Sequence, residues 1–195
     1  MNDEYRTVSK PMVTRAVIQR SVFLAHVQEV DSEEEARAFV ASVREQHKQA
    51  AHNCYAYRMG ITGEETFYID DDGEPHGTAG KPIYGAILNR DVTNVVLVVT
   101  RYFGGKKLGV RGLIEAYGGA ARDVIDHAGV VTRILMEEIK LRCNYSQLNE
   151  VLYRVNRWSA ELTESHYTEE VQLSLRVRRR DAGQFREALQ GILGP

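Results

Sequence analysis

The chain has 195 residues, which is more than one average domain and less than two, since domains usually contain about 100 to 150 residues. Hydrophobic residues make up 43% and charged residues 27%, a globular composition that excludes collagen-like, disordered and disulfide-scaffold proteins. Twenty-five Lys and Arg against 27 Asp and Glu leave a net charge of −2. The protein as a whole therefore does not attract nucleic acid or anionic lipid, and any such binding requires a local patch.

The sequence has no feature of a membrane or exported protein. Its longest aliphatic run, Val95–Val99, is far shorter than the ~20 residues of a membrane helix. The N-terminal residues carry charges of both signs and no apolar stretch, unlike a secretory signal. Without export, Cys54 and Cys143 are not expected to form a disulfide. We therefore expect a cytoplasmic protein with no membrane partner.

The first third of the chain predicts two strands and a helix. Val13–Val30 is rich in Val, Ile and Phe and is interrupted at Gln19–Ser21, which indicates two strands joined by a tight turn. Ser32 followed by Glu35 is a capping-box pattern. The apolar positions that follow recur at helical spacing and predict a helix with one apolar face: Ala36, Phe39, Val40, Val43, His47 and Ala50.

The middle of the chain predicts a hairpin, two helices and a central strand. Residues 53–59 and 65–69 are expected to form strands around Gly60 and Gly63. A proline needs no backbone donor in the first turn of a helix, so Pro82 fits a helix start. Val95–Val99 lacks alternation, as in a strand covered on both faces. A second long helix is expected from about Val110, ended by Gly129.

After Gly129 the pattern begins again. A strand is expected over 134–141, a helix around 148–155, a strand near 158–162, an alternating strand over 171–177 and a final helix around 185–192. This order suits a ferredoxin-like unit whose last strand is missing or very short. The sequence thus predicts an α+β protein with one domain over residues 1–133 and a smaller one over residues 134–195.

Three segments interrupt the globular pattern beside predicted strand ends, where binding sites are commonly built, and we expect them to lie side by side and line one cleft of the N-terminal domain. They are residues 52–57, the acidic segment (Asp70–Pro82) and the basic segment (Thr100–Gly112). The side chains and glycines expected to bind a ligand are His52, Asn53, Asp71, Asp72, Glu74, Thr78, Arg101, Tyr102, Phe103, Gly104, Gly105, Lys106, Lys107 and Arg111.

The basic segment has the composition of a weak RNA-binding loop. Its glycines let backbone donors approach a phosphate, its four Lys and Arg side chains neutralise charge, and Tyr102 or Phe103 can stack on a base. Stacking contributes about 1 to 3 kcal/mol per base. The structural alternative is a tight turn whose aromatic rings enter the core and whose basic side chains are solvated or attracted to the acidic segment.

The acidic segment does not match a known metal or phosphate loop. An EF-hand loop starting at Asp70 would need a glutamate at its twelfth position, where Lys81 stands. A Walker A loop fails because Pro75 replaces the first glycine and Pro82 the Ser or Thr that binds magnesium. No metal and no cofactor are expected, and a solvated acidic turn is the structural alternative.

A thiol nucleophile with a histidine base is a weak hypothesis here. His52 and Cys54, with His76 elsewhere, supply the residue types. In a strand, however, residues 52 and 54 share a face and lie too far apart for a designed pair unless the backbone bends. A buried structural thiol is the more common fate of a lone cysteine, so no catalytic residue is assigned.

Taken together and in this order, the three segments resemble the YigZ/IMPACT family. The resemblance rests on HNCYAYRMG at 52–60, DDGEPHGTAGKPI at 71–83 and NVVLVVTRYFGGKKLGVRGLIEAYGGAA at 94–121. Residues 134–195 look like the smaller C-terminal domain of bacterial members. The resemblance implies an N-terminal domain similar to the second domain of a small-subunit ribosomal protein. It also implies a ferredoxin-like βαββα C-terminal domain similar to a domain of elongation factor G.

The resemblance leaves two classes of function open. Eukaryotic relatives regulate translation by competing for the activator of a kinase that phosphorylates an initiation factor, a role that is not transferred to a bacterial-type chain. The favoured interpretation is a non-enzymatic, translation-associated or regulatory protein that binds RNA or ribosome-related partners through the basic segment. The alternative is a small-molecule enzyme or nucleotide- or anion-binding protein that uses His52 and the cleft of the DDGEP motif. The sequence does not indicate an oligomeric state.

Overall fold

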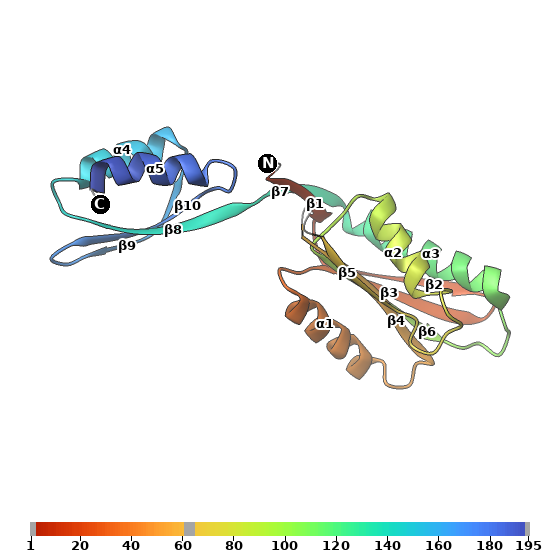
Figure 1. Cartoon of the computed structure of the whole chain (residues 1–195). Coiled ribbons are helices and arrows are strands. Elements are labelled where there is room, and N and C mark those ends of the chain that lie inside the picture. The colour runs from red at the N-terminus through yellow and green to blue at the C-terminus, as the bar shows by residue number, and fades with distance from the viewer. Residues whose placement is uncertain (1–2, 61–64, 194–195) are drawn as a thin grey trace. The chain divides into compact units, whose positions relative to one another are not determined.

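A computed structural model describes residues 3–60 and 65–193. The chain forms two compact units (Figure 1). Tyr5–Arg133 make up the N-terminal unit, and Asp3 and Glu4 join the chain from Ile134 onward in the C-terminal unit. Mixed helices and strands in both units give an α+β protein, as the sequence predicts.

The N-terminal unit is built on one five-stranded antiparallel sheet. The elements up to residue 134 are β1 (Glu4–Val8), β2 (Met12–Ile18), β3 (Ser21–Glu29), α1 (Glu33–Gln46), β4 (His52–Met59), β5 (Thr66–Asp70), α2 (Gly80–Asn89), β6 (Val95–Tyr102), α3 (Gly109–Ala128) and β7 (Val130–Ile134). The strand order is β2-β3-β6-β4-β5, and every neighbouring pair runs antiparallel. Helices α2 and α3 cover one face, and α1 lies on the other (Figure 1).

The predicted first hairpin and first helix are both confirmed. Gln19 and Arg20, between β2 and β3, have φ values of 45° and 70°, the positive angles that a two-residue hairpin turn requires at both central positions. Helix α1 begins after Ser32, whose side chain accepts a hydrogen bond from the Glu35 N–H at 3.1 Å. The Glu35 carboxylate accepts a hydrogen bond from the Asp31 N–H at 2.9 Å. In a standard capping box the donor would be the N–H of the N-cap residue, here Ser32, so this box uses the residue before it.

The central strand β6 separates two hydrophobic layers. Alternate side chains of a strand point to opposite faces of the sheet. Accordingly, Leu97 lies in the cluster with residues of α2 and α3, whereas Val98 lies in the cluster with residues of α1. Pro82 lies in the first turn of α2, and α3 ends at Gly129, whose φ of 72° suits glycine. These three sequence-based predictions are confirmed.

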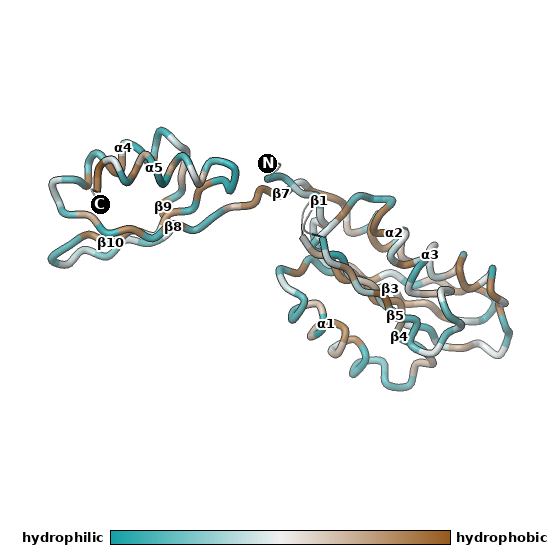
Figure 2. Tube along the Cα trace, in the orientation of Figure 1, coloured by the Kyte–Doolittle hydropathy of each residue, from teal (hydrophilic) through white to brown (hydrophobic). Residues whose placement is uncertain are grey.

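Strands β4 and β5 form the predicted second hairpin, with Tyr57 paired with Tyr68. Its predicted turn residue Gly63 lies outside the described residues. Figure 2 shows hydrophobic residues along the strands of the sheet and along α2 and α3, while α1 is largely hydrophilic. In the described ranges, no helix combines the length and the apolar character needed to cross a bilayer.

The C-terminal unit has the predicted order strand, helix, strand, strand, helix. Its elements are β8 (Met136–Cys143), α4 (Leu148–Arg157), β9 (Glu161–Tyr167), β10 (Val171–Arg178) and α5 (Ala182–Leu193). The antiparallel order β8-β10-β9 inserts β10 between the strands joined by α4, which is the split βαβ arrangement of ferredoxin-like folds. Strand β9 begins later than predicted, because Trp158 ends α4 and packs beside Phe185, with ring centroids 6.1 Å apart.

Two short strands were not predicted. β1 and β7 pair with each other in a two-stranded sheet. Just before β1, the Asp3 carboxylate accepts two hydrogen bonds from the Arg178 guanidinium, at 2.9 and 3.1 Å. This ion pair explains why Asp3 belongs with the C-terminal unit, although the sequence-based boundary assigned residues 1–133 to one domain.

Candidate functional site: a pocket between β6 and α3

Residues from all three predicted segments line one pocket of the N-terminal unit, which we call the β6–α3 pocket. Its volume is about 410 Å³, within the usual range for small-molecule sites. It is lined by His52, Glu74, Pro75, Arg101, Phe103, Lys107, Leu108, Gly109, Val110 and Leu113. The expectation that the three segments lie side by side is therefore confirmed.

Strand β6 extends through Tyr102 and so separates two neighbours that the sequence analysis grouped together. Arg101 points to the side of α3 and lines the pocket. Tyr102 points to the side of α1, where its hydroxyl lies 2.9 Å from Nδ1 of His47 at the end of that helix. Phe103 follows the strand, lines the pocket and is 52% exposed. Of the two aromatic rings, the structure brings only Phe103 to the pocket.

A buried ion pair is part of the pocket lining. Arg101 Nη1 donates to Glu74 Oε1 at 2.6 Å, and the two side chains are only 6% and 4% exposed. The Arg101 guanidinium carbon lies 5.7 Å from the ring centroid of Phe23 and 5.4 Å from that of Phe103, within cation–π range. Its Nε is buried and has no hydrogen-bond partner among the described residues. Arg101 is thus a fixed, buried cation rather than a mobile surface charge.

Tyr117 of α3 completes this polar cluster. Its side chain is fully buried. Its hydroxyl donates to Glu74 Oε1 at 2.8 Å, and burial raises the pKa of that hydroxyl. The available sequence signal was the residue type, because a buried tyrosine usually finds a partner for its hydroxyl. The identity of the partner depends on the fold.

His52 presents one ring nitrogen toward the pocket. Its Nδ1 lies 2.8 Å from the backbone carbonyl of Asp72, which can only accept, so Nδ1 carries the proton in the neutral ring. Its Nε2 lies 3.8 Å from Glu74 Oε1. In the neutral ring Nε2 is therefore a hydrogen-bond acceptor at the edge of the pocket.

The carboxylate of Asp71 holds the acidic segment together instead of facing the pocket. It accepts hydrogen bonds from the backbone N–H groups of Gly77, Ala79 and Gly80, at 2.7, 3.0 and 2.8 Å. Burial alone would raise the pKa of Asp71, but these three donors outweigh it and hold the pKa below its usual value. Asp71 thereby caps the start of α2 from within the loop.

Asp72 ties the acidic segment to β4 and α1. Its Oδ2 accepts from the Asn53 N–H at 2.6 Å, and its Oδ1 accepts from Arg44 of α1 at 2.8 Å. Asn53 in turn accepts from the Thr100 hydroxyl at 2.7 Å. The Thr78 hydroxyl donates to the backbone carbonyl of Pro75 at 2.7 Å, which closes a local turn. These contacts position the pocket wall, and none of the three predicted residues Asn53, Asp72 and Thr78 lines the pocket itself.

The arrangement around Cys54 does not suit a nucleophile. Its side chain is fully buried, and the thiol donates to the carbonyl of Asp71 at 3.0 Å. Burial raises the pKa of the thiol, which keeps it protonated at neutral pH. Within the described ranges, no three His, Cys, Asp or Glu side chains are grouped to hold a metal ion.

The turn into α3 contains glycines with different roles. A Cβ at Gly104 would lie 2.0 Å from the carbonyl oxygen of Arg20, so the backbone there passes directly against the β2–β3 turn. Gly105 and Gly109 have φ values of 83° and 72° and open space around them. The first of these positions needs glycine for close packing, and the other two need it for backbone conformation.

The start of α3 faces the pocket without a side-chain cap. Leu108 occupies the N-cap position, and no acidic residue lies in the first turn. Lys107 lines the pocket, whereas Lys106 is exposed beside it. Arg111 is 93% exposed and pairs with Glu115 at 2.9 Å along the helix surface. Of the predicted surface cations, Lys107 is the one that the structure brings to the pocket.

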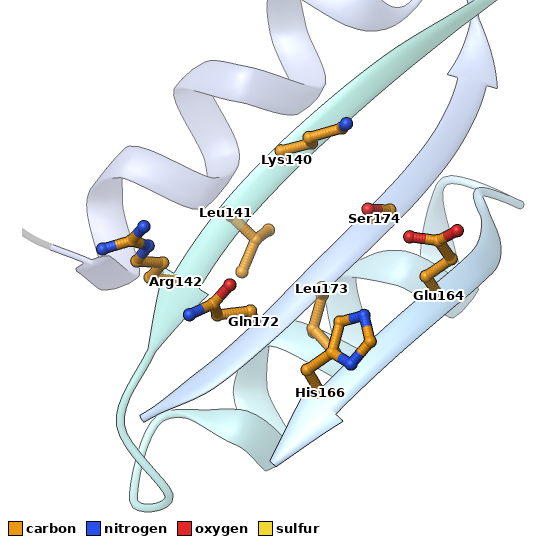
Figure 3. A pocket seen from close by; sticks show the side chains of 8 residues that line it. All are labelled: Lys140, Leu141, Arg142, Glu164, His166, Gln172, Leu173 and Ser174. Carbon is orange, nitrogen blue, oxygen red and sulfur yellow. The ribbon is translucent and has the colours of Figure 1, made fainter. Parts of the chain in front are cut away.

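A second hollow lies on the sheet of the C-terminal unit, on the face opposite α4 and α5 (Figure 3). Its volume is about 320 Å³, and its lining residues are Lys140, Leu141, Arg142, Glu164, His166, Gln172, Leu173 and Ser174. Across the strands, Gln172 lies opposite Arg142 and His166. Acidic and basic side chains are mixed on this surface, and none of them is among the binding residues predicted from the sequence.

Comparison with known proteins places both units in one family of two-domain proteins. The Impact N-terminal domain matches residues 19–125, and a domain of unknown function, DUF1949, matches residues 141–193. The chain is 37% identical to IMPACT family member YvyE of Bacillus subtilis, over 96% of this chain and 86% of that protein. It is 34% identical to IMPACT family member YigZ of Escherichia coli, over 80% and 78%. A crystal structure of a hypothetical protein, 29% identical, superposes with a TM-score of 0.72 over 98% of this chain and 93% of that one.

Proposed function

Because the chain belongs to the IMPACT family, we propose that it is a cytoplasmic, non-enzymatic regulatory protein associated with translation. Its partner in this proposal is single-stranded RNA, free or as part of the ribosome, bound at the mouth of the β6–α3 pocket. The family resemblance of the three sequence segments supports the link to translation. The chemistry of the pocket mouth supports RNA as the partner.

One observation carries the RNA assignment. Phe103, 52% exposed, stands beside Lys106 and Lys107, and neither lysine forms an ion pair with a residue that the structure describes. An exposed ring can stack on a base, and solvated lysines can contact the phosphates on either side of it. Arg101, Tyr102 and Arg111 have protein partners, so the proposal assigns the RNA contacts to Phe103 and the two lysines.

A non-enzymatic role fits the state of the reactive side chains. The Cys54 thiol is buried and protonated, and the Asp71 carboxylate is held by three backbone donors. Glu74 is paired with Arg101 and Tyr117. Such groups maintain the shape of a binding surface and are poorly placed to exchange protons with a substrate.

The test is titration of a short single-stranded RNA at several salt concentrations. Two phosphate contacts predict a log–log slope of about −1.4, because each contact on a single strand contributes about −0.7. Replacing Lys106 and Lys107 together with Ala should reduce the size of this slope toward zero. Phe103→Ala should weaken binding and leave the slope unchanged, because stacking does not depend on salt.

The matched control for Phe103 is Phe67→Ala, which removes another ring of the N-terminal unit that is 56% exposed. That variant should bind RNA like the wild type. If the wild type binds no RNA even in low salt, the RNA proposal is wrong. The alternative would then be a small-molecule enzyme or an anion-binding protein that uses His52 and the acidic segment.

A further inference from the structure

The β6–α3 pocket combines three features that a phosphorylated nucleoside would match. Its lining includes the uncapped start of α3 with Lys107, several apolar side chains, and the polar cluster of His52, Glu74 and Arg101. We propose that this pocket binds a nucleoside monophosphate unit, either as a free nucleotide or as the phosphorylated end of an RNA. If the ligand is the end of an RNA, this inference rests on the proposed function and specifies that the phosphorylated terminal nucleotide enters the pocket.

The phosphate is assigned to the start of α3. The first N–H groups of a helix have no partner within the helix, and the helix dipole favours an anion there. In α3 no side chain caps these groups and no acidic residue competes for them. Gly109 has no atom within 4 Å of its Cβ position, so the backbone is open to a ligand. Lys107, exposed and lining the same pocket, adds a positive charge.

The buried Arg101 is an independent sign of a ligand. Its side chain lines the pocket and is only 6% exposed. Its Nε nevertheless has no hydrogen-bond partner among the described residues. A buried donor without a partner is costly, so Nε calls for an acceptor that the protein itself does not supply, and a molecule in the pocket can supply it. Because Glu74 neutralises most of its charge, Arg101 fits a polar group of the ligand better than a second phosphate.

The base and sugar are assigned to the apolar wall. Phe103, Val110 and Leu113 are apolar members of the lining, and Phe103 supplies a flat surface for stacking. In the neutral ring of His52, Nδ1 donates to Asp72 and Nε2 is free to accept a hydrogen bond from a ligand. The polar cluster can therefore contact the edge of a base whose face lies on Phe103. The pocket volume of about 410 Å³ suits a ligand of this class.

The experiment compares adenosine 5′-monophosphate, adenosine and inorganic phosphate by calorimetric titration of the full chain. We expect the monophosphate to bind at least about tenfold more tightly than adenosine, which corresponds to the loss of one charge-assisted contact. Inorganic phosphate should bind weakly and compete with the monophosphate. Equal affinity for the monophosphate and adenosine would overturn the proposal.

Two variants separate the pocket from general effects of charge. Val110→Asp places an acid in the first turn of α3, where it supports the helix but repels a phosphate, so it should abolish binding without lowering the melting temperature. Lys107→Ala should weaken binding by about tenfold, whereas Lys106→Ala, its neighbour outside the pocket, should not. Wild-type affinity in both Val110→Asp and Lys107→Ala would refute the proposed site.

Competition experiments with RNA distinguish this inference from the proposed function. An RNA with a 5′- or 3′-phosphate should compete with the monophosphate better than the same RNA with hydroxyl ends. If RNA binds regardless of its end groups and the monophosphate does not bind, the proposed function stands and this inference fails. If the monophosphate binds and no RNA does, the pocket takes free nucleotides and the RNA proposal fails.

Discussion

The acidic and basic segments lie next to each other but use their charges differently. In the acidic segment, the carboxylates of Asp71, Asp72 and Glu74 all accept hydrogen bonds, Asp71 from backbone N–H groups of the same segment and the other two from β4 and β6. In the basic segment, Lys106 and Lys107 remain at the surface. A cluster of like charges in a sequence thus has two outcomes. The carboxylates of the acidic segment stabilise the fold, and the lysines of the basic segment remain available to a ligand.

The largest effect on stability is expected at the Arg101–Glu74 pair, which tests whether the acidic segment is part of the scaffold. Glu74→Ala leaves a buried guanidinium without its counter-ion, and such a change typically lowers the free energy of unfolding by about 3–5 kcal/mol. The measurement is chemical denaturation followed by far-UV circular dichroism. Trp158, the single tryptophan, lies in the C-terminal unit, so its fluorescence should report a transition that the substitution does not change.

The matched control is Glu115→Ala, which breaks the exposed pair of Glu115 with Arg111. Solvent screens such a pair, so the denaturation midpoint should not move. If Glu74→Ala were as stable as Glu115→Ala, the acidic segment would not be part of the scaffold.

Close packing within the basic segment gives the next largest effect. Gly104→Ala forces a Cβ against the Arg20 carbonyl, where the distance would be 2.0 Å, and we expect a loss of about 3 kcal/mol, the upper end for overpacking. Gly105→Ala meets no atom but adopts a φ of 83°, which costs about 1–2 kcal/mol. Denaturation of both variants measures the difference. Equal losses would show that the β2–β3 turn moves to accommodate the methyl group.

A pH-dependent effect is expected at Asp71. Asp71→Asn leaves a single acceptor oxygen for three backbone donors, and losing such a cap costs about 1–2 kcal/mol at pH 7. Because the pKa of Asp71 is lower in the folded than in the unfolded protein, this stabilisation is complete above the unfolded value of about 3.9. It is lost as the pH falls through the lowered pKa of the folded state.

Stability curves of the wild type and Asp71→Asn between pH 7 and about pH 2 provide the check. The difference between them should shrink only at the acidic end. A difference that stays constant over the whole range would assign the effect to the shape of the asparagine and not to the charge of Asp71.

Much of the fold was predictable because periodicity encodes it locally. Val95–Val99 and the helix ended by Gly129 are long, regular patterns, and both were identified. Strand β1 was missed because Glu4–Val8 is short and half polar, and it depends on pairing with β7, far along the chain. Contacts between distant segments leave no periodic signal in either of them.

The site was predictable as a neighbourhood but not residue by residue. The composition of the segments indicated a shared cleft, and His52, Glu74, Arg101, Phe103 and Lys107 line it. Arg101 and Tyr102 are separated because side chains alternate along a strand. The aliphatic run ends at Val99, whereas β6 continues to Tyr102. Nothing in three consecutive aspartates indicates which one caps α2, because only the folded backbone determines the donors each one meets.

The smallest expected effect distinguishes the two neighbouring aromatic rings. Tyr102→Phe removes the hydroxyl contact with His47 and should lower the free energy of unfolding by about 1 kcal/mol, while RNA and nucleotide binding stay unchanged. Phe103→Ala should do the reverse. It should weaken RNA binding by about 1–3 kcal/mol because one base loses its stacking partner, with little change in stability because the ring is half exposed. Parallel thermal denaturation and RNA titration of both variants measure the two effects. If Tyr102→Phe weakened binding at constant stability, the ligand would contact the α1 side of the sheet, and the proposed site on the α3 side would be wrong.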